Sequence, residues 1–364
     1  MKTILRTAAA FLLLAAMLLT TACSTATIPA MEYEGNTISV NMYKYWLSRY
    51  KAVFLYSYSD ITDTAEFWNT VIDSNGTTYE DFLTEVVNEN IKSYLVAATL
   101  CEDYGIKIDA ETEKMLDEYI DELINELGEG SRSQFNQYAS AYGVNSRILK
   151  DVYVTEEKLS VLYEYLYGEN GKTRITDEQK DQYYHDNYYL IQHLYINDQY
   201  EYILDENGNY SYGEDGYALT RELTADELAA KTAAIEAVKE GLESGETFES
   251  LYDSYSEDKF YPNGYYLTVS TQFVTEIVTS AVKMNVGDVE ILETDLGFHV
   301  VKKYPLNEKA YEDTANADFF DGYEDMVGQY FYHQEISSMA EDVVVHEDAI
   351  ADVRLSTVTA NYSF

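Results

Sequence analysis

The sequence of 364 residues is poor in basic residues and contains only three prolines and two cysteines. It has 24 Lys and Arg against 65 Asp and Glu, which gives a formal net charge of −41. Such a surface repels phosphate backbones and anionic lipid headgroups, so nucleic-acid binding is excluded. The acidic residues are spread along the whole chain. They therefore indicate a solvated exterior, with an attraction for cations or basic partners as a further consequence.

The scarcity of cysteine limits how the chain can be stabilised. After Cys23 only Cys101 remains, so the rest of the chain has no internal disulfide and must be held by its core. Cys101 lies in an apolar helical run over residues 94–101, a pattern typical of a small buried residue. The composition, 46% hydrophobic and 14% aromatic, is sufficient for more than one core.

The first residues have the pattern of an export signal. Residues 1–22 contain Lys2 and Arg6, followed by an uncharged run that is too short for a membrane-spanning helix of about 20 residues. Residues 20–23 (Thr-Thr-Ala-Cys) resemble a bacterial lipobox, although that pattern prefers Leu where Thr20 stands. We therefore expect a lipoprotein signal peptide over 1–22, lipidation of Cys23 and a lipidated tether over 23–30. The alternative is ordinary cleavage beside an incidental cysteine.

The next segment is patterned for helices. A helix is expected over about 41–58, and a capping box from Thr77 to Glu80 predicts the start of a long helix that ends at Gly105. A further amphipathic helix is expected over 109–127. No constellation of chemical groups accompanies these helices, so we expect them to pack or bind and not to catalyse.

From about residue 190 the pattern changes to strand, helix, helix, strand, and a second capping box, Thr224 with Glu227, opens one of these helices. Only five histidines exist in the chain, and two of them, His193 and His299, lie in short apolar strands. One histidine in an apolar run is typically a core residue. Two on strands that frame one α/β unit predict a paired site. A metal site is disfavoured because no Cys, Asp or Glu stands at ligand spacing around them.

Five motifs in this segment occur in the order known from one family. They are Gln192–Leu194, the helix start Glu246–Leu251, Tyr255–Asp258, Val286–Val289 and Thr294–His299. Residues 188–305 therefore resemble a parvulin-type peptidyl-prolyl isomerase domain, which has βα3βαβ2 topology. With the lipoprotein signal and helical flanks, the chain resembles extracellular foldase lipoproteins of the PrsA type and SurA-like chaperones.

The resemblance implies an α+β fold in which the parvulin domain is inserted into an all-helical chaperone-like region. That region consists of an N-terminal part, 31–187, and a C-terminal segment, 306–364, which packs on it. Four catalytic residues follow from the resemblance: His193 and His299 as a hydrogen-bonded pair, Thr294 as the residue that orients His299, and Asp258 as an electrostatic partner. Asp258 could equally be a helix-end residue.

The resemblance also implies a pocket for the proline ring. Phe273 and Ile277 would form its floor, and Leu267 or Tyr266 its wall, although the first two would bury an apolar face in any fold. Rotation about the X-Pro bond breaks no bond, so no nucleophile, metal or cofactor is required. The stretch 263–269 departs from the family because it keeps one glycine and adds bulk. The acidic segment 197–201 would repel phosphorylated substrates.

These observations favour a membrane-tethered peptidyl-prolyl isomerase and foldase, lipid-anchored on the outer face of a bacterial cell membrane. Its partners would be unfolded or partly folded exported polypeptides with X-Pro bonds. The alternative is a non-catalytic holdase with a vestigial parvulin domain, since the altered stretch 263–269 could weaken turnover. Homodimerisation through the helical region is left open.

Overall fold

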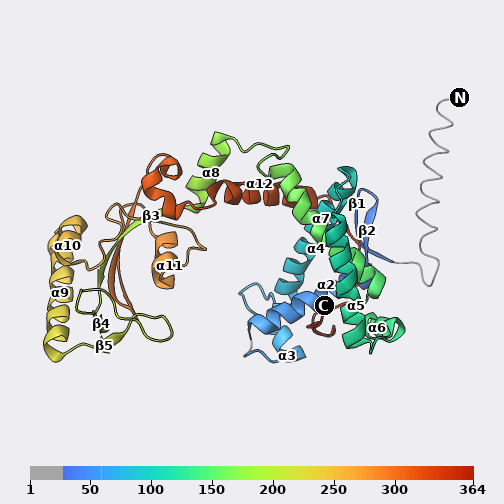
Figure 1. Cartoon of the computed structure of the whole chain (residues 1–364), viewed down its shortest axis with the longest axis horizontal. Helices are drawn as coiled ribbons and strands as arrows, with labels where there is room; N and C mark the ends of the chain where they lie inside the picture. Colours follow the sequence, from blue (N-terminus) through green and yellow to red (C-terminus); the bar gives the residue numbers. More distant parts are fainter. Residues whose placement is uncertain (1–27, 59) are drawn as a thin grey trace. The chain divides into compact units, whose positions relative to one another are not determined.

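The computed structural model describes residues 28–58 and 60–364. The expected signal peptide, the lipidation residue Cys23 and the first residues of the tether lie outside the described residues. Within the described part, no helix is long and apolar enough to cross a membrane. The chain forms two compact units: unit 1 extends to Arg174 and includes Phe331–Phe364, and unit 2 is Ile175–Tyr330. Figure 1 shows the elements of each unit along the chain.

Unit 1 is mainly helical, as expected, and its buried apolar side chains form one large cluster. Its elements are β1 (Pro29–Tyr33), β2 (Asn36–Ser39), α2 (Val40–Ser57), α3 (Ala65–Trp68), α4 (Tyr79–Asp103), α5 (Ala110–Leu127), α6 (Arg132–Ala139), η1 (Ser140–Tyr142), α7 (Ser146–Tyr167), β9 (Val344–Val345) and α13 (Glu347–Ile350). The strands form a sheet of order β2-β1-β9. The sheet adds three strands to a region predicted to be all-helical; its third strand, β9, pairs with β1, about three hundred residues earlier in the sequence.

The start of α4 differs from the predicted capping box by one residue. Thr78 accepts a hydrogen bond from the backbone N–H of Asp81, and the Asp81 carboxylate accepts one from the backbone N–H of Thr78. Glu80, the predicted partner, is buried and accepts hydrogen bonds from the backbone N–H and hydroxyl of Ser356. Its carboxylate is therefore not available to cap the helix. The other predicted box, Thr224 with Glu227, is confirmed at the start of α9.

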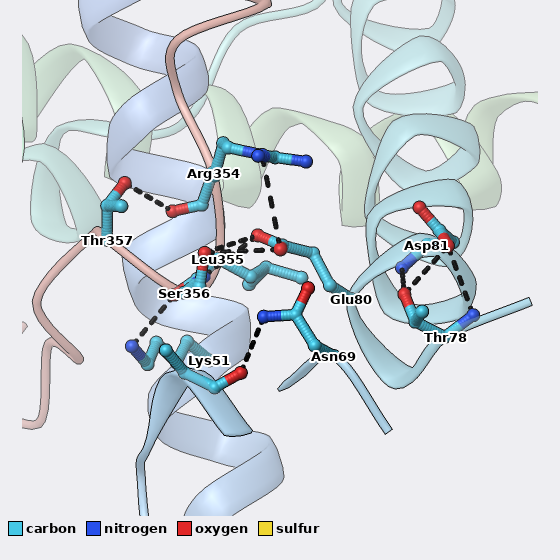
Figure 2. Close-up of polar contacts among 10 residues, drawn as sticks. Lys51, Asn69, Thr78, Glu80, Asp81, Arg354, Leu355, Ser356 and Thr357 are labelled. Atoms are coloured by element: carbon cyan, nitrogen blue, oxygen red, sulfur yellow. Dashed lines mark hydrogen bonds and ion pairs between the residues drawn. The ribbon is translucent and has the colours of Figure 1, made fainter. Parts of the chain in front are cut away.

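The last residues of the chain are held in unit 1 by two buried charged side chains. The Lys51 ammonium donates to the carbonyl oxygens of Leu355 and Val358 at 2.8 and 2.9 Å, and it lies 2.8 Å from Asp63 Oδ1. Glu80 holds Ser356 (Figure 2). The charges of these side chains are matched by charged or hydrogen-bonding partners, which is the condition for burying them.

Unit 2 contains the segment that resembles a parvulin domain. Its elements are α8 (Asp177–Asn187), β3 (Tyr189–Ile196), β4 (Tyr200–Tyr202), β5 (Thr220–Glu222), α9 (Ala225–Ser244), α10 (Phe248–Tyr255), β6 (Tyr265–Leu267), α11 (Thr275–Lys283), β7 (Val289–Thr294), β8 (Gly297–Tyr304), η2 (Ala310–Glu312), η3 (Thr314–Phe319) and the first part of α12 (Tyr323–Ala340). Residues 197–264, all of them described, hold two α-helices where the expected topology has three. The small β4–β5 sheet precedes them.

The main sheet of unit 2 has the order β6-β3-β8-β7, and every neighbouring pair is antiparallel. Apolar clusters lie on both faces. Ile191 and Val301 pack with side chains of α11, whereas Leu194 and Val300 pack with side chains of α9 and α10. The sheet is therefore covered on both sides, which explains why β3 and the first half of β8 are mainly apolar.

Candidate functional site

The sheet register brings the two histidines together. Side chains alternate between the faces of a strand, so His193 shares a face with Ile191, and His299 shares a face with Val301. Both therefore lie on the face that α11 covers. In the ladder His193 pairs with Val301, and Tyr195 pairs with His299. The histidines are thus diagonal neighbours on adjacent strands, a separation that long or aromatic side chains can bridge.

The predicted pair is present as a buried hydrogen-bonded unit. His193 Nε2 lies 2.7 Å from His299 Nδ1, and the rings are stacked with centroids 4.9 Å apart. On the other side of His299, Thr294 Oγ1 lies 2.8 Å from Nε2. His193 is 4% exposed and His299 is 1% exposed. The structure therefore brings His193, His299 and Thr294 together as the resemblance implied.

Asp258 lies beside His193, at the other end of this row of side chains. Its Oδ2 lies 3.4 Å from His193 Nδ1, and the same oxygen accepts a hydrogen bond from the hydroxyl of Tyr265. Oδ1 accepts from the backbone N–H of Phe260 at 3.0 Å. Burial opposes ionisation of Asp258. The nearby His193 and the hydrogen bonds from Tyr265 and Phe260 outweigh it, so the pKa of this carboxyl is lowered.

The charge of Asp258 and the burial of His299 determine which ring nitrogens of the two histidines carry a proton. Burial, and to a smaller extent His193, lowers the pKa of His299 to about 4, so this imidazole is neutral at pH 7. A carboxylate beside His193 Nδ1 favours a proton on that nitrogen, which leaves Nε2 as an acceptor for His299 Nδ1–H. Nε2 of His299 then accepts from the hydroxyl of Thr294. Asp258 thus selects one tautomer for both rings.

A cavity of about 660 Å³ opens beside the histidine pair, and both histidines and Asp258 line it. About half of the other lining residues are aromatic: Tyr195, Tyr200, Tyr202, Tyr210, Phe260, Tyr261, Tyr265 and Phe273. Phe273 stands edge-on to His193, with ring centroids 5.9 Å apart and planes at 87°. The arrangement offers a largely aromatic surface next to the neutral imidazole of His299.

Only one of the four predicted pocket residues lines this cavity. Phe273 does so, whereas Leu267 and Ile277 lie in the buried cluster between the sheet and α11. Tyr266 points to the other face of β6, where its hydroxyl accepts from Asn307 Nδ2 at 2.7 Å and its ring packs against Phe320. Of residues 265–267, only Tyr265 lines the cavity.

The altered stretch 263–269 is built into the site. Gly264 has φ +98°, and a Cβ there would lie 2.5 Å from the carbonyl oxygen of Ile191, so the one retained glycine is required for β6 to pair with β3. The tyrosine that follows it reaches Asp258. The added bulk therefore supplies a contact of the site, and the cavity remains open.

Sequence reasoning missed two residues of the site, Tyr195 and Tyr265. Tyr195 stacks on His299 with centroids 5.1 Å apart, and its hydroxyl donates to the carbonyl oxygen of Leu296 at 2.7 Å. Tyr195 could have been found from strand alternation, because it lies two residues after His193. Tyr265 depends on the pairing of β6 with β3, in which it lies opposite Ile191.

The fold and the site define a class of protein, and a comparison with protein families supports it. Residues 213–304 match the family model described as the PPIC-type PPIASE domain. Unit 2 therefore contains a parvulin-type peptidyl-prolyl isomerase domain. The matched range begins after β3, so His193 is assigned by its geometry and by its motif.

Several solved structures are also similar to this chain. The chain is similar to PrsA from Bacillus subtilis, with 17% identity over 79% of this chain and 92% of that chain and a TM-score of 0.24. It is similar to a peptidylprolyl isomerase (PrsA) from Bacillus cereus, with 20% identity over 79% and 97% and a TM-score of 0.25. A SurA-like chaperone of Campylobacter jejuni shares 9% identity over 78% and 93%, with a TM-score of 0.21. No curated protein matches the chain.

Proposed function

We propose that this protein is a lipid-anchored peptidyl-prolyl cis-trans isomerase and foldase that assists exported polypeptides after translocation, on the outer face of a bacterial cell membrane. The observation that carries the proposal is the network of Asp258, His193, His299 and Thr294 beside an open aromatic cavity. The export signal and Cys23 in the sequence support the location. Two acyl chains would be sufficient for stable anchoring.

The site is suited to lowering the barrier of about 18–20 kcal/mol that opposes rotation of a peptide bond. The planar amide owes its stability to charge separation between oxygen and nitrogen, which water favours. In a cavity lined by aromatic rings and by a neutral His299, this charge separation loses its solvation, whereas the twisted bond has less to lose. Asp258 contributes by keeping both imidazoles in a fixed tautomer and orientation.

The alternative, a holdase with an inactive parvulin domain, is supported by unit 1. Exposed apolar side chains recur there at helical spacing, Val53 and Tyr56 on α2, and Phe82 and Val86 on α4. Such side chains could hold an unfolded client. Because the catalytic network is complete and its cavity is open, we favour an enzyme that also uses unit 1 to bind clients.

Catalysis of proline-limited refolding of a model protein tests this proposal. The parent chain from Ser24 onward should accelerate the slow phase, and His193→Ala and His299→Ala should each lose most of the acceleration, on the order of 10²-fold, since each removes a member of the hydrogen-bonded network. His185→Ala, which removes an exposed histidine of the same unit, is the matched control and should behave as the parent.

Thermal melts of the same variants separate a catalytic from a structural role. If either histidine variant melts far below the parent, the residue is a core residue and the loss of activity carries no weight. In that case the activity assay is repeated with His299→Gln, which keeps a hydrogen-bonding side chain, in place of the alanine variant. A parent chain that prevents aggregation but does not accelerate the slow phase would establish the holdase.

A further inference from the structure

The segment between β3 and α9 forms a folded arm, residues 197–222, that is separate from the catalytic network. β4 pairs with β5, and a middle segment joins both: Ser211 N–H donates to Ile203 O at 2.8 Å, and Leu219 N–H donates to Ser211 O at 2.7 Å. Further bridges link Leu204 to Tyr210 and Tyr212 to Ala218. The arm is therefore a small β element with a defined backbone and not an irregular loop.

The composition of the arm is biased toward one kind of partner. Residues 197–220 contain six carboxylates, five tyrosines and no Lys or Arg. Arg221 is the first basic residue, and Glu227 binds its guanidinium. An arm of this kind repels anionic segments and attracts cationic ones. Its tyrosine rings are also the surfaces over which Lys and Arg side chains bind by cation–π attraction.

The tyrosines of the arm continue the wall of the isomerase cavity. Tyr200 and Tyr202 alternate with Glu201 and so share one face of β4, and their ring planes stand at 86° with centroids 5.3 Å apart. The Tyr210 ring lies 4.9 Å from that of Tyr202. All three line the cavity that holds His193 and His299. Aromatic side chains thus line this cavity both beside the histidine pair and on the arm.

The cavity is larger than a proline ring requires. Its volume of about 660 Å³ lies in the range of pockets that bury a drug-sized ligand, so it can hold a proline together with neighbouring residues of an extended peptide. Tyr202 is 36% exposed and Tyr210 is 50% exposed. Their rings are therefore open to a side chain that lies beside the proline.

We propose that the arm is a specificity subsite of the isomerase cavity, in which Tyr202 and Tyr210 bind a Lys or Arg side chain next to the isomerised proline while the carboxylates of the arm attract it. The proposal rests on the proposed function, because the subsite acts on the substrate of that activity. It makes the protein selective for client segments that combine proline with basic residues.

Isomerisation of matched peptides tests this subsite. The peptides carry Lys, Gln or Glu at one position beside the X-Pro bond, and the position is scanned on both sides. At low ionic strength we expect kcat/KM for the best Lys peptide to exceed that of its Glu counterpart by about tenfold. The double variant Tyr202→Ala/Tyr210→Ala should lose most of this preference. Tyr212→Ala/Tyr217→Ala removes two exposed tyrosines of the same arm outside the cavity and should retain it.

Binding of the same peptides, measured by calorimetry, separates the two proposals. If the Gln peptide is isomerised but Lys gives no preference at any position, or if the preference survives in Tyr202→Ala/Tyr210→Ala, the subsite is wrong and the isomerase stands. If no peptide is isomerised but the Lys peptide binds more tightly in a manner that requires Tyr202 and Tyr210, the subsite stands and the enzyme proposal fails.

Discussion

Both units of this protein bury polar side chains, but Lys51 of unit 1 binds other groups of the unit, whereas the two histidines of unit 2 border a cavity. In unit 1, Lys51 is 2% exposed, and two carbonyl oxygens and Asp63 accept from its ammonium group. Its three donors are used within the unit, so none is left for a ligand. In unit 2, His193 and His299 are as deeply buried, but their network borders a cavity. Burial alone therefore does not distinguish a structural polar group from a functional one, whereas the space beside it does.

The two networks should also respond differently to substitution. A buried polar group whose partners are all internal contributes to the stability of the fold, and its removal leaves those partners unsatisfied. A network at the edge of a cavity contributes to what the cavity can hold and to which protonation state it presents. Substitutions in the network of unit 1 should therefore lower the free energy of unfolding, and substitutions in the network of unit 2 should change the activity and its pH dependence.

The largest effect is expected from Lys51→Met. The substitution leaves the carbonyl oxygens of Leu355 and Val358 without their donor in a buried site, so we expect the free energy of unfolding of unit 1 to fall by about 3–5 kcal/mol. The only two tryptophans, Trp46 and Trp68, are both in unit 1, so tryptophan fluorescence during urea unfolding reports this unit alone.

The matched control for this experiment is Lys114→Met, which removes a lysine whose side chain is 74% exposed and forms an ion pair with Glu118 on α5. It should change stability by less than about 0.5 kcal/mol. A fluorescence transition of Lys51→Met that coincides with that of the parent would show that the C-terminal residues are held by their apolar contacts and not by this lysine.

A smaller effect is expected from the protonation of His299, which should lower the free energy of unfolding by about 3 kcal/mol between pH 6.5 and 4. Its pKa is lowered to about 4 in the folded protein, against about 6.5 when unfolded, so acid protonates the unfolded chain first. The stability that neutral His299 contributes is complete above pH 6.5 and is lost as the pH falls toward 4. Urea unfolding across this range, followed by far-ultraviolet circular dichroism, measures the loss once the transition of unit 1, which tryptophan fluorescence reports, is subtracted.

Carboxyl groups also titrate in this pH range and change the stability of the protein. The difference between the parent and His299→Gln therefore isolates the contribution of His299. The glutamine variant should lose less stability than the parent between pH 6.5 and 4, and His185→Gln should follow the parent. Parallel pH curves for the parent and His299→Gln would show that His299 is accessible to protons in the folded state.

The sequence predicted the parts of the site that depend on local pattern. Apolar strands with one histidine each, and motifs in a known order, were sufficient for His193, His299, Thr294 and Asp258 to be assigned and then found in one network. The mainly helical character of unit 1 followed from helical periodicity. The helical character of unit 1 and the pairing of the histidines need only periodicity and the alternation of side chains along a strand, whereas Thr294 and Asp258 were assigned from the family resemblance.

The parts that failed depend on pairing between distant residues. The wall of the cavity was assigned to Tyr266 or Leu267, but β6 has only three residues, and a shift of one residue in its register exchanges the two faces. Likewise, no periodicity indicates that Glu80 will bind Ser356 and leave the cap of α4 to Asp81. The sequence indicated only an acidic segment, 197–201, and a polar, tyrosine-rich stretch, 200–217, and only the folded arm shows that its tyrosines line the cavity.

The smallest effect, and the one that tests the corrected wall directly, is expected from Tyr265→Phe. The substitution removes a hydroxyl that donates to Asp258 and helps to keep the pKa of that carboxyl low. We expect kcat/KM for proline isomerisation to fall about tenfold, equivalent to about 1.4 kcal/mol. The acid limb of the pH–activity profile should move to higher pH, because Asp258 then takes up its proton more easily.

Tyr266→Phe is the control for this prediction, since it removes the hydroxyl of the next residue, which lies on the other face of β6 and binds Asn307. Its kcat/KM should remain within about twofold of the parent, although the lost hydrogen bond should lower stability by about 1 kcal/mol. If Tyr266→Phe reduces activity and Tyr265→Phe does not, then the wall assigned from the sequence is the correct one, and the register of β6 against β3 must differ by one residue in the active protein.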